Sequence, residues 1–271
     1  VVAQLKAQND PQLNIGFQVG TYYYNVNPGI KPFNNVKVRK ALSMALDRSV
    51  ITENITQGGQ IPAYGVVPPG MQDENGNDFR EVQGDLFKFD PEEAKKLFEE
   101  GLKEEGMTVE DFNKQGFVLL FNTSESHKKI AQAAQEMWRN NLGVEIGLEN
   151  VEFQVKLDRE KAGDYHLSRA GWIGDFMDPM TFLDLWWSQS EFNDVKYNNP
   201  DYDALILQAK SSNDQSVRMT AMKEAEKMLM EDMPVIPVYF YTQPYTVKPN
   251  VTGIVKVPVR YPIITYADIT Q

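Results

Sequence analysis

The middle of the chain has the most regular pattern of apolar and polar positions. Residues 117–121 are an apolar run, residues 130–138 carry apolar side chains at helical spacing, and residues 144–148 alternate between apolar and polar. A second helical stretch over 152–161 and a short strand over 165–170 follow. The predicted order is therefore β-α-β-α-β, which favours a parallel sheet with right-handed crossovers.

Three further elements are predicted before this region. Residues 22–27 are aromatic and β-prone, as in a strand. From Val36 apolar residues recur with the i, i+3, i+4 spacing of a helix with one buried face, and Asn35 is suited to cap it. Asp90-Pro91 predicts a helix start, with Asp at the N-cap and Pro at the first helical position, and this helix should run to about Glu105.

The rest of the chain is less regular. Residues 58–89 contain many Gly and Pro residues and predict a long irregular loop. Asp178-Pro179 predicts another helix start, and residues 201–231 carry a helical pattern. Residues 235–241 are β-branched and aromatic, as in a strand, and residues 246–271 hold only short β-prone runs between Pro and Gly. No repeat of fixed period occurs, so we expect one packed globule or two.

Composition excludes several classes of protein. The chain has 271 residues, 27 Lys and Arg against 38 Asp and Glu, two His and no Cys. It is long enough to bury a full core in one large domain or two smaller ones. Without Cys it has no disulfide, thiolate nucleophile, Cys zinc site or iron–sulfur cluster.

The charge balance argues against nucleic acid as a partner. The formal net charge is −11 and no basic stripe is present, whereas nucleic-acid binding requires clustered Lys and Arg. The apolar runs are far shorter than the ~20 residues that a membrane-spanning helix needs. Residues 1–9 show neither the charged nor the apolar region of an export signal, so either no such signal existed or it has been removed.

Signals for catalysis or metal binding are weak. His127 and His166 belong to no metal-binding spacing, and no nucleophile elbow or phosphate-binding glycine loop occurs. With 38 carboxylates, pairs of acids arise by chance. His127 follows residues 123–126 directly after a predicted strand, so it should lie at a helix N-terminus, where backbone N–H groups favour an anion such as a carboxylate.

The segment 169–179 is the most informative part of the chain. It leaves a predicted strand and enters a helix, which is where open α/β sheets bind ligands. Asp178 is explained as the N-cap before Pro179. Asp175 lies between aromatic residues and is either an ordinary surface acid or a carboxylate that holds a partner cation. Trp186-Trp187 is interpreted as core packing with one partly exposed ring.

Several blocks together resemble the oligopeptide-binding proteins of ABC importers, part of an extracellular solute-binding family that also includes dipeptide, nickel and haem binders. The resembling blocks are Tyr22-Tyr23-Tyr24-Asn25-Val26-Asn27, residues 33–42, Ile61-Pro62-Ala63-Tyr64-Gly65, Asn122-Thr123-Ser124, His127-Lys128-Lys129, Arg169-Ala170-Gly171-Trp172 with Asp175, and Pro237-Val238-Tyr239. They follow the family's order over nearly the whole chain, and they favour the oligopeptide binders over other branches.

The resemblance implies a periplasmic-binding-protein-like α/β lobe with a mainly parallel sheet flanked by helices. Family members are much longer, and these blocks belong to their C-terminal half, so we expect a fragment of a two-lobed protein. Residues 25–235 would form the second, ligand-binding lobe. Residues 1–24 and 236–271 would belong to the first lobe. Most of the first lobe, a signal peptide and any lipid-bearing Cys would precede Val1.

The resemblance also implies the site. Asp175 would pair with the α-ammonium group of a peptide, and His127 would help to bind its C-terminal carboxylate at certain peptide lengths. Arg169 and Tyr241 would line the cleft. The other expected peptide-binding residues are Trp172, Ile173 and Phe153.

Three positions depart from the family pattern. Phe153 stands where relatives can carry Trp, and Ile173 is bulkier than the residues expected there, which narrows the pocket beside Asp175. Glu160 stands where an Arg can assist the ligand carboxylate, and the adjacent Arg159 would replace it after a one-residue slip.

The expected protein is therefore a non-enzymatic, extracytoplasmic component of an importer, periplasmic or lipid-anchored at the cell surface. Its expected partners are an oligopeptide, the ABC permease subunits and the remainder of the first lobe, with no nucleic acid, cofactor or metal. It would meet a membrane only through a lipid anchor outside this chain. Two alternatives remain: another solute of the same family, such as a dipeptide, nickel chelate, haem or sugar, or an extracellular hydrolase that uses paired carboxylates.

Overall fold

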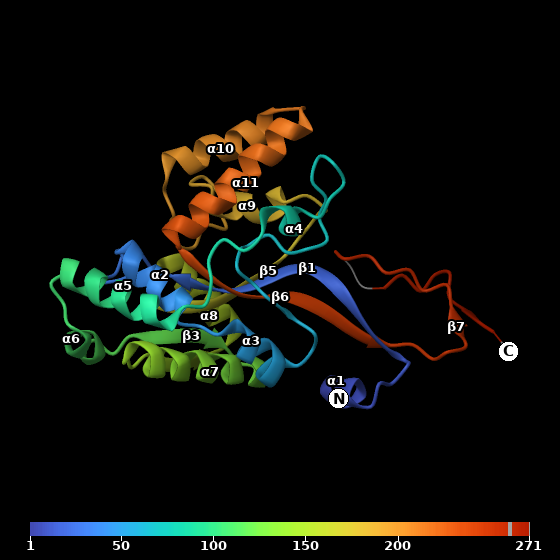
Figure 1. Ribbon diagram of the computed structural model, residues 1–271, viewed down its shortest axis with the longest axis horizontal. Helices are drawn as coiled ribbons and strands as arrows, with labels where there is room; N and C mark the ends of the chain where they lie inside the picture. The colour runs from blue at the N-terminus through green and yellow to red at the C-terminus, as the bar shows by residue number, and fades with distance from the viewer. Residues whose placement is uncertain (260–261, 271) are drawn as a thin grey trace.

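The computed structural model describes residues 1–259 and 262–270. It confirms the α/β class (Figure 1). The helices are α1 (Val2–Ala7), α2 (Val36–Met44), α3 (Arg48–Val50), the π-helix η1 (Ile51–Thr56), α4 (Phe79–Gln83), α5 (Pro91–Glu104), α6 (Val109–Lys114), α7 (Glu125–Leu142), α8 (Phe153–Ala162), α9 (Met180–Leu183), the 3₁₀ turn η2 (Asp184–Trp186), α10 (Pro200–Ser211) and α11 (Gln215–Asp232). The strands are β1 (Leu13–Val26), β2 (Ile61–Pro62), β3 (Val118–Asn122), β4 (Gly147–Val151), β5 (Leu167–Ile173), β6 (Val235–Thr246), β7 (Val251–Thr252) and β8 (Asp268–Ile269).

The main sheet is mixed, so the expectation of a mainly parallel sheet was wrong. Its strand order is β2-β6-β1-β5-β3-β4. Strand β3 runs parallel to β4 and β5, as the β-α-β-α-β pattern predicted. Strand β1 is antiparallel to both β5 and β6, and β2 is antiparallel to β6. The reason is that crossover helices connect only β3, β4 and β5, while β1 and β6 come from the two ends of the chain.

The second half of β1, residues 19–26, is buried on both faces and separates two hydrophobic cores. Successive side chains of a strand point to opposite faces, and Tyr22 and Tyr24 accordingly enter one core while Tyr23 enters the other. The first core lies under α2, α5 and α7. The second lies under α9, α10 and α11, which form the upper group of helices in Figure 1. The sheet is therefore a middle layer between two groups of helices.

Two predicted helix starts are confirmed. The side chain of Asn35 accepts a hydrogen bond from the backbone N–H of Lys37 at the start of α2. Asp90 caps α5 through the N–H of Glu93. The 201–231 pattern proves to be two helices, α10 and α11.

The helix predicted from Asp178 is shorter than expected and begins later. The cap position of α9 is Pro179 rather than Asp178. Asp178 instead accepts a hydrogen bond from the N–H of Met180 at 3.0 Å, and its other oxygen pairs with Arg218 at 3.0 Å. The ion pair with Arg218 on α11 explains the acid at position 178, and no bound ligand is needed to explain it.

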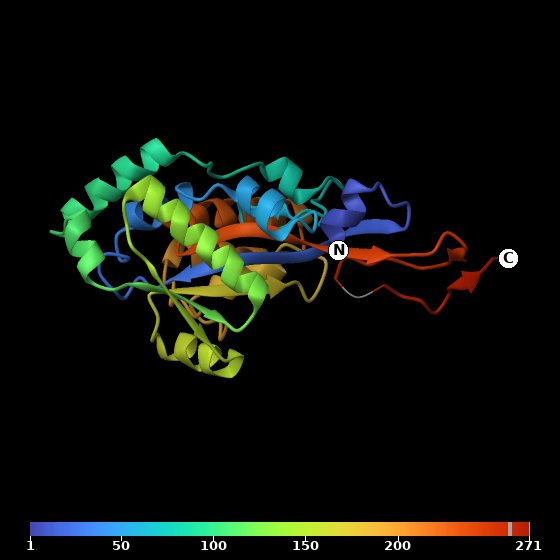
Figure 2. The ribbon, with the colours of Figure 1, turned by 90° about the horizontal axis from the view of Figure 1, so that it is seen from below.

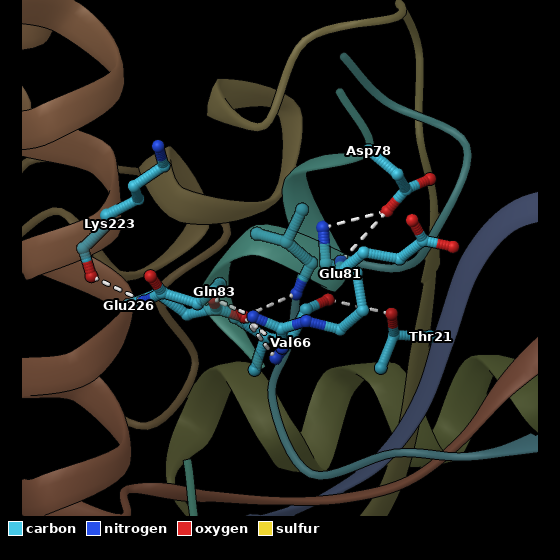
Figure 3. Close-up of polar contacts among 9 residues, drawn as sticks. Thr21, Val66, Asp78, Glu81, Gln83, Lys223 and Glu226 are labelled. Atoms are coloured by element: carbon cyan, nitrogen blue, oxygen red, sulfur yellow. Dashed lines mark hydrogen bonds and ion pairs between the residues drawn. The ribbon is translucent and has the colours of Figure 1, made fainter. Parts of the chain in front are cut away.

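The loop 58–89 is ordered by a buried network on α11 (Figure 3). One oxygen of Glu226 accepts hydrogen bonds from the N–H groups of Val66 and Val67, each at 2.8 Å, and the other pairs with Arg80 at 2.6 Å. The hydroxyl of Thr21 on β1 donates to the carbonyl of Val66 at 2.8 Å. A Cβ at Gly65 would lie 1.7 Å from Arg80 Nη1 and 2.7 Å from Glu226 Oε1, so a larger residue would displace this ion pair. The network fixes the loop against β1 and α11.

The two chain ends lie on the same side of the molecule. Strand β6 continues into an extended arm that contains β7 and β8 and projects beyond the body (Figures 1 and 2). The predicted lobe boundaries fall near the end of β1 and at the start of β6, and they stay a prediction. Within residues 1–259 and 262–270, no helix has the length and apolar character needed to cross a membrane.

Candidate functional site

Strand β5 carries three of the seven expected site residues, and Asp175 lies two residues after its end. In the antiparallel pairing with β1, Arg169 lies opposite Tyr24, Trp172 opposite Thr21, and Ile173 opposite Gly20. Alternation along the strand places Arg169 and Ile173 on one face and Trp172 on the other. Arg169 and Ile173 therefore lie in a different environment from Trp172.

Arg169 lies in a group of aromatic side chains, which we call the tyrosine cluster: Tyr22, His127, Arg169, Tyr239 and Tyr241. The guanidinium carbon lies 4.7 Å from the centroid of the Tyr22 ring, and Nη2 donates a hydrogen bond to the Tyr241 hydroxyl at 3.0 Å. Tyr22 stacks on Tyr239 with ring centroids 4.7 Å apart. Across the described residues, no carboxylate lies within ion-pair distance of Arg169. The guanidinium of Arg169 thus contacts an aromatic ring and a hydroxyl group.

The glycine at position 171 makes the contact between Arg169 and Tyr241 possible. A Cβ at Gly171 would lie 2.9 Å from the Tyr241 hydroxyl and 3.5 Å from Arg169 Nη2. A larger residue would displace the hydroxyl, because so close an approach to a Cβ is sterically unfavourable. Gly171 therefore lets Tyr241 reach across β5.

His127 is placed as predicted, in the first turn of α7. Its backbone N–H donates to the Ser124 hydroxyl, which caps the helix, and Nδ1 lies 3.4 Å from the Tyr22 hydroxyl. Burial, with smaller contributions from the charges of Arg169 and Lys156, lowers the pKa of His127 to about 4. Its imidazole is therefore neutral at pH 7.

A buried ion pair on α8 adjoins this cluster. Lys156 Nζ lies 2.5 Å from a carboxylate oxygen of Glu160, and the two side chains are 3% and 2% exposed. Burial lowers the pKa of Lys156 and raises the pKa of Glu160. Arg159 points elsewhere and pairs with Glu149 at 2.7 Å and Asp164 at 3.0 Å. Arg159 and Glu160 therefore have different ionic partners in this structure, Glu149 and Asp164 for Arg159 and Lys156 for Glu160.

Asp175 lines a second feature, the Asp175 pocket, with a volume of about 330 Å³. We define this pocket by Trp172, Asp175, Asp184, Trp187, Glu191, Phe192 and Lys210. The backbone N–H of Asp175 donates to the Thr181 hydroxyl at 3.0 Å, which fixes the loop after β5. The Asp175 side chain is exposed, and in the described part of the chain it forms no ion pair.

The seven expected residues thus fall into two groups, with Ile173 beside the first and Phe153 apart from both. His127, Arg169 and Tyr241 meet in the tyrosine cluster, while Trp172 and Asp175 line the Asp175 pocket. Ile173 and Tyr241 flank Gly20, where an added Cβ would lie within 3 Å of both side chains. Phe153 begins α8 with a 50% exposed side chain, and the aromatic contacts found in the described chain do not involve it.

Sequence reasoning missed the roles of Tyr22 and Tyr239 in this site. The alternation along 22–24 shows which tyrosines share a face, but the contact of Tyr22 with Tyr239 follows from the pairing of β1 with β6. The interpretation of Trp186-Trp187 is confirmed, since Trp186 is buried and Trp187 is partly exposed. In residues 1–259 and 262–270, no three His, Asp or Glu side chains are grouped so as to hold a metal ion.

Comparison with known proteins identifies the family. Residues 1–194 match the family described as bacterial extracellular solute-binding proteins, family 5 Middle. The chain belongs to this family. Its relatives include the dipeptide-binding protein DppE of Bacillus subtilis, 38% identical over 271 residues that cover 99% of this chain and 49% of DppE. The oligopeptide-binding protein OppA of Bacillus subtilis is 39% identical over 250 residues, 92% of this chain and 45% of OppA.

Solved structures of family 5 proteins have the same fold. Listeria monocytogenes OppA bound to peptide superimposes with a TM-score of 0.83 at 29% identity, covering 100% of this chain and 52% of that protein. Haemophilus influenzae OppA in complex with RPPGFSPFR gives 0.80 at 33% identity, covering 99% and 52%. The chain spans about half the length of the relatives it matches. These relatives are named as binding proteins, not enzymes.

Proposed function

We propose that this chain forms the second lobe of a two-lobed protein that captures oligopeptides outside the cytoplasmic membrane and delivers them to an ABC importer. Membership of family 5 and the likeness to peptide-binding proteins support this proposal. This proposed function requires no catalytic step.

One observation carries the proposal: β5 and the loop after it carry two opposite charges that have no ionic partners in the described residues. The guanidinium of Arg169 is on β5, and the carboxylate of Asp175 follows the same strand. A peptide has an ammonium group at one end and a carboxylate at the other. Opposite charges at separate positions of one site match the two charged ends of a peptide.

The proposed roles follow from these charges. Asp175 pairs with the peptide α-ammonium, and Arg169, assisted by His127, attracts the C-terminal carboxylate. Trp172, Ile173, Phe153 and Tyr241 contact the peptide between its ends. A charged pair of this kind is favourable when it is enclosed and well hydrogen-bonded, which a closing cleft between two lobes provides.

The remaining partners are proposed from the family. Residues 1–24 and 236–271 would pack with the remainder of the first lobe, and the chain would pass between lobes along the adjacent strands β1 and β6. The ligand would shift an equilibrium between open and closed lobes, and the permease would recognise the closed form. The protein would be periplasmic, or held at the membrane by a lipid anchor outside this chain.

The decisive experiment compares free and N-acetylated tetrapeptides by calorimetry on the two-lobed protein that carries this chain. Asp175→Asn should weaken binding of the free peptides by about thirtyfold or more, because a desolvated ammonium loses its carboxylate. Acetylation of the ligand should have a similar effect on the wild type. The matched control is Asp85→Asn, at an exposed acid of the loop 58–89, which should leave affinity unchanged.

The same titrations also test dipeptides as the alternative ligand. DppE is named as a dipeptide binder, so dipeptides are included as competitors. Tighter binding of dipeptides than of tetrapeptides would contradict the oligopeptide assignment. Equal binding of free and acetylated peptides would contradict the role of Asp175.

A further inference from the structure

The Asp175 pocket has a strongly acidic lining. Three carboxylates face it, those of Asp175, Asp184 and Glu191. The one cation that lines it is Lys210, which pairs with Asp184 at 3.2 Å. In the described chain neither Asp175 nor Glu191 has an ionic partner, so the pocket keeps an excess of negative charge.

The same pocket has aromatic walls. Trp172 and Phe192 contact each other with ring centroids 5.0 Å apart at an angle of 61°, and Phe192 is 61% exposed. Lys210 Nζ lies 4.6 Å from the centroid of the Trp187 ring. Carboxylates combined with exposed rings attract alkylammonium and guanidinium groups. The ammonium group of Lys210 already makes both kinds of contact, an ion pair with Asp184 and a cation–π contact with Trp187.

The wall that carries Glu191 and Phe192 is fixed rather than loose. Asn193, which is 4% exposed, accepts a hydrogen bond from the N–H of Tyr197 at 3.0 Å and donates one to the Tyr197 carbonyl at 2.8 Å. The N–H of Ser190 donates to the Trp187 carbonyl at 2.8 Å. These bonds fix the backbone of segment 187–193, so the ligand does not have to order that backbone.

The size of the pocket limits what it can take. Its volume of about 330 Å³ is at the lower end of the range for ligand pockets, so it suits one side chain rather than a whole oligopeptide. Asp175 belongs both to this pocket and to the proposed ammonium contact. The side chain that begins next to the α-ammonium is that of the first residue of the peptide.

We propose that the Asp175 pocket receives the side chain of the ligand's first residue and selects Lys or Arg at that position. This inference rests on the proposed function, because it requires Asp175 to hold the α-ammonium. Glu191 and Phe192 are the specificity-determining residues, since they line the pocket without belonging to the expected main-chain contacts. Lys210 offsets part of the negative charge and limits the preference.

The test uses four tetrapeptides, X-Ala-Ala-Ala with X as Arg, Lys, norleucine or Glu, titrated into the two-lobed protein. The Arg and Lys peptides should bind about three- to fivefold more tightly than the norleucine peptide, and the Glu peptide should bind most weakly. Glu191→Gln should reduce this preference while leaving the norleucine peptide nearly unaffected, and Phe192→Ala should also reduce the preference. Glu224→Gln, the same change at an exposed position of α11, should leave the preference intact.

Each outcome separates this inference from the proposed function. Equal binding of the Arg and norleucine peptides, or a preference that survives in both pocket variants, overturns the assignment of the pocket but leaves peptide capture standing. Absence of binding by all four peptides overturns the proposed function and the inference with it. A preference lost in Glu191→Gln and kept in Glu224→Gln supports both.

Discussion

At the scale of single residues, the site is notable for a cation held by neutral groups. Arg169 contacts the Tyr22 ring and the Tyr241 hydroxyl, and burial raises the pKa of Tyr22 well above its ordinary value, so this neighbour stays uncharged. A carboxylate in this place would cancel the charge before any ligand arrived. Tyrosine positions the guanidinium and leaves its attraction for an anion intact.

The lowered pKa of His127 predicts a pH dependence of stability. The folded-state pKa of about 4 is below the ordinary value of 6.5, so the unfolded chain binds a proton first as the pH falls. Stability from this group is complete above about pH 6.5 and is lost progressively between pH 6.5 and 4. With allowance for solvent screening, we expect a loss of roughly 1 kcal/mol.

Urea unfolding at pH 7.5, 6 and 5 measures this effect. His127→Gln should show a smaller loss of unfolding free energy over this range than the wild type, by about that amount. His166 is present in both proteins, so its own titration cancels in the comparison. Identical pH dependence of the two proteins would contradict the assignment.

At the scale of elements, α8 shows how far a pattern of apolar positions can be trusted. The sequence predicted the helix over 152–161 and the structure places it at Phe153–Ala162. Its inward face, however, carries Lys156 and Glu160, which an apolar pattern assigns to solvent. Burial of the pair depends on the one-turn spacing and on the neighbouring sheet, where Asn25 lies 3.4 Å from Glu160.

This buried pair predicts opposite results for single and double substitutions. Lys156→Met should lower the unfolding free energy by about 3 kcal/mol, because it leaves the Glu160 carboxylate buried without its cation. Lys156→Met combined with Glu160→Leu should restore stability to within about 1 kcal/mol of the wild type, since apolar side chains of similar size replace both charges. Urea denaturation of the three proteins measures both values. A double variant as unstable as the single one would refute this account.

Capping residues and the spacing of apolar residues correctly predicted several helices and strands. The caps at Asn35 and Asp90 and the β3-α7-β4-α8-β5 series depend on spacing and capping, which are readable along the chain. Strand β1 was predicted from 22, but it begins at Leu13, where Leu13, Ile15 and Phe17 already alternate with polar or small residues. The antiparallel neighbours of β1 and the contact of Arg169 with Tyr241 depend on pairing between distant segments, which no local pattern contains.

At the scale of the whole molecule, the site is open on one side. Asp175 and Phe192 are exposed in this chain, and the proposed first lobe would cover them. We therefore expect the 271-residue chain by itself to bind tetrapeptides more weakly than about 100 μM, because half of the enclosing contacts are missing and water screens the charges. Calorimetry on the isolated chain checks this, and micromolar or tighter binding would contradict it.

The position of β6 in the sheet sets the order of events during synthesis. Strand β6 lies between β2 and β1, and its partners on β1 are on the order of 200 residues earlier in the chain. While only the residues up to the end of α11 have emerged from the ribosome, β6 is missing. The edges of β1 and β2 that pair with β6 then stay open. The six-stranded sheet is therefore complete only after β6, its last strand in the chain, has been translated.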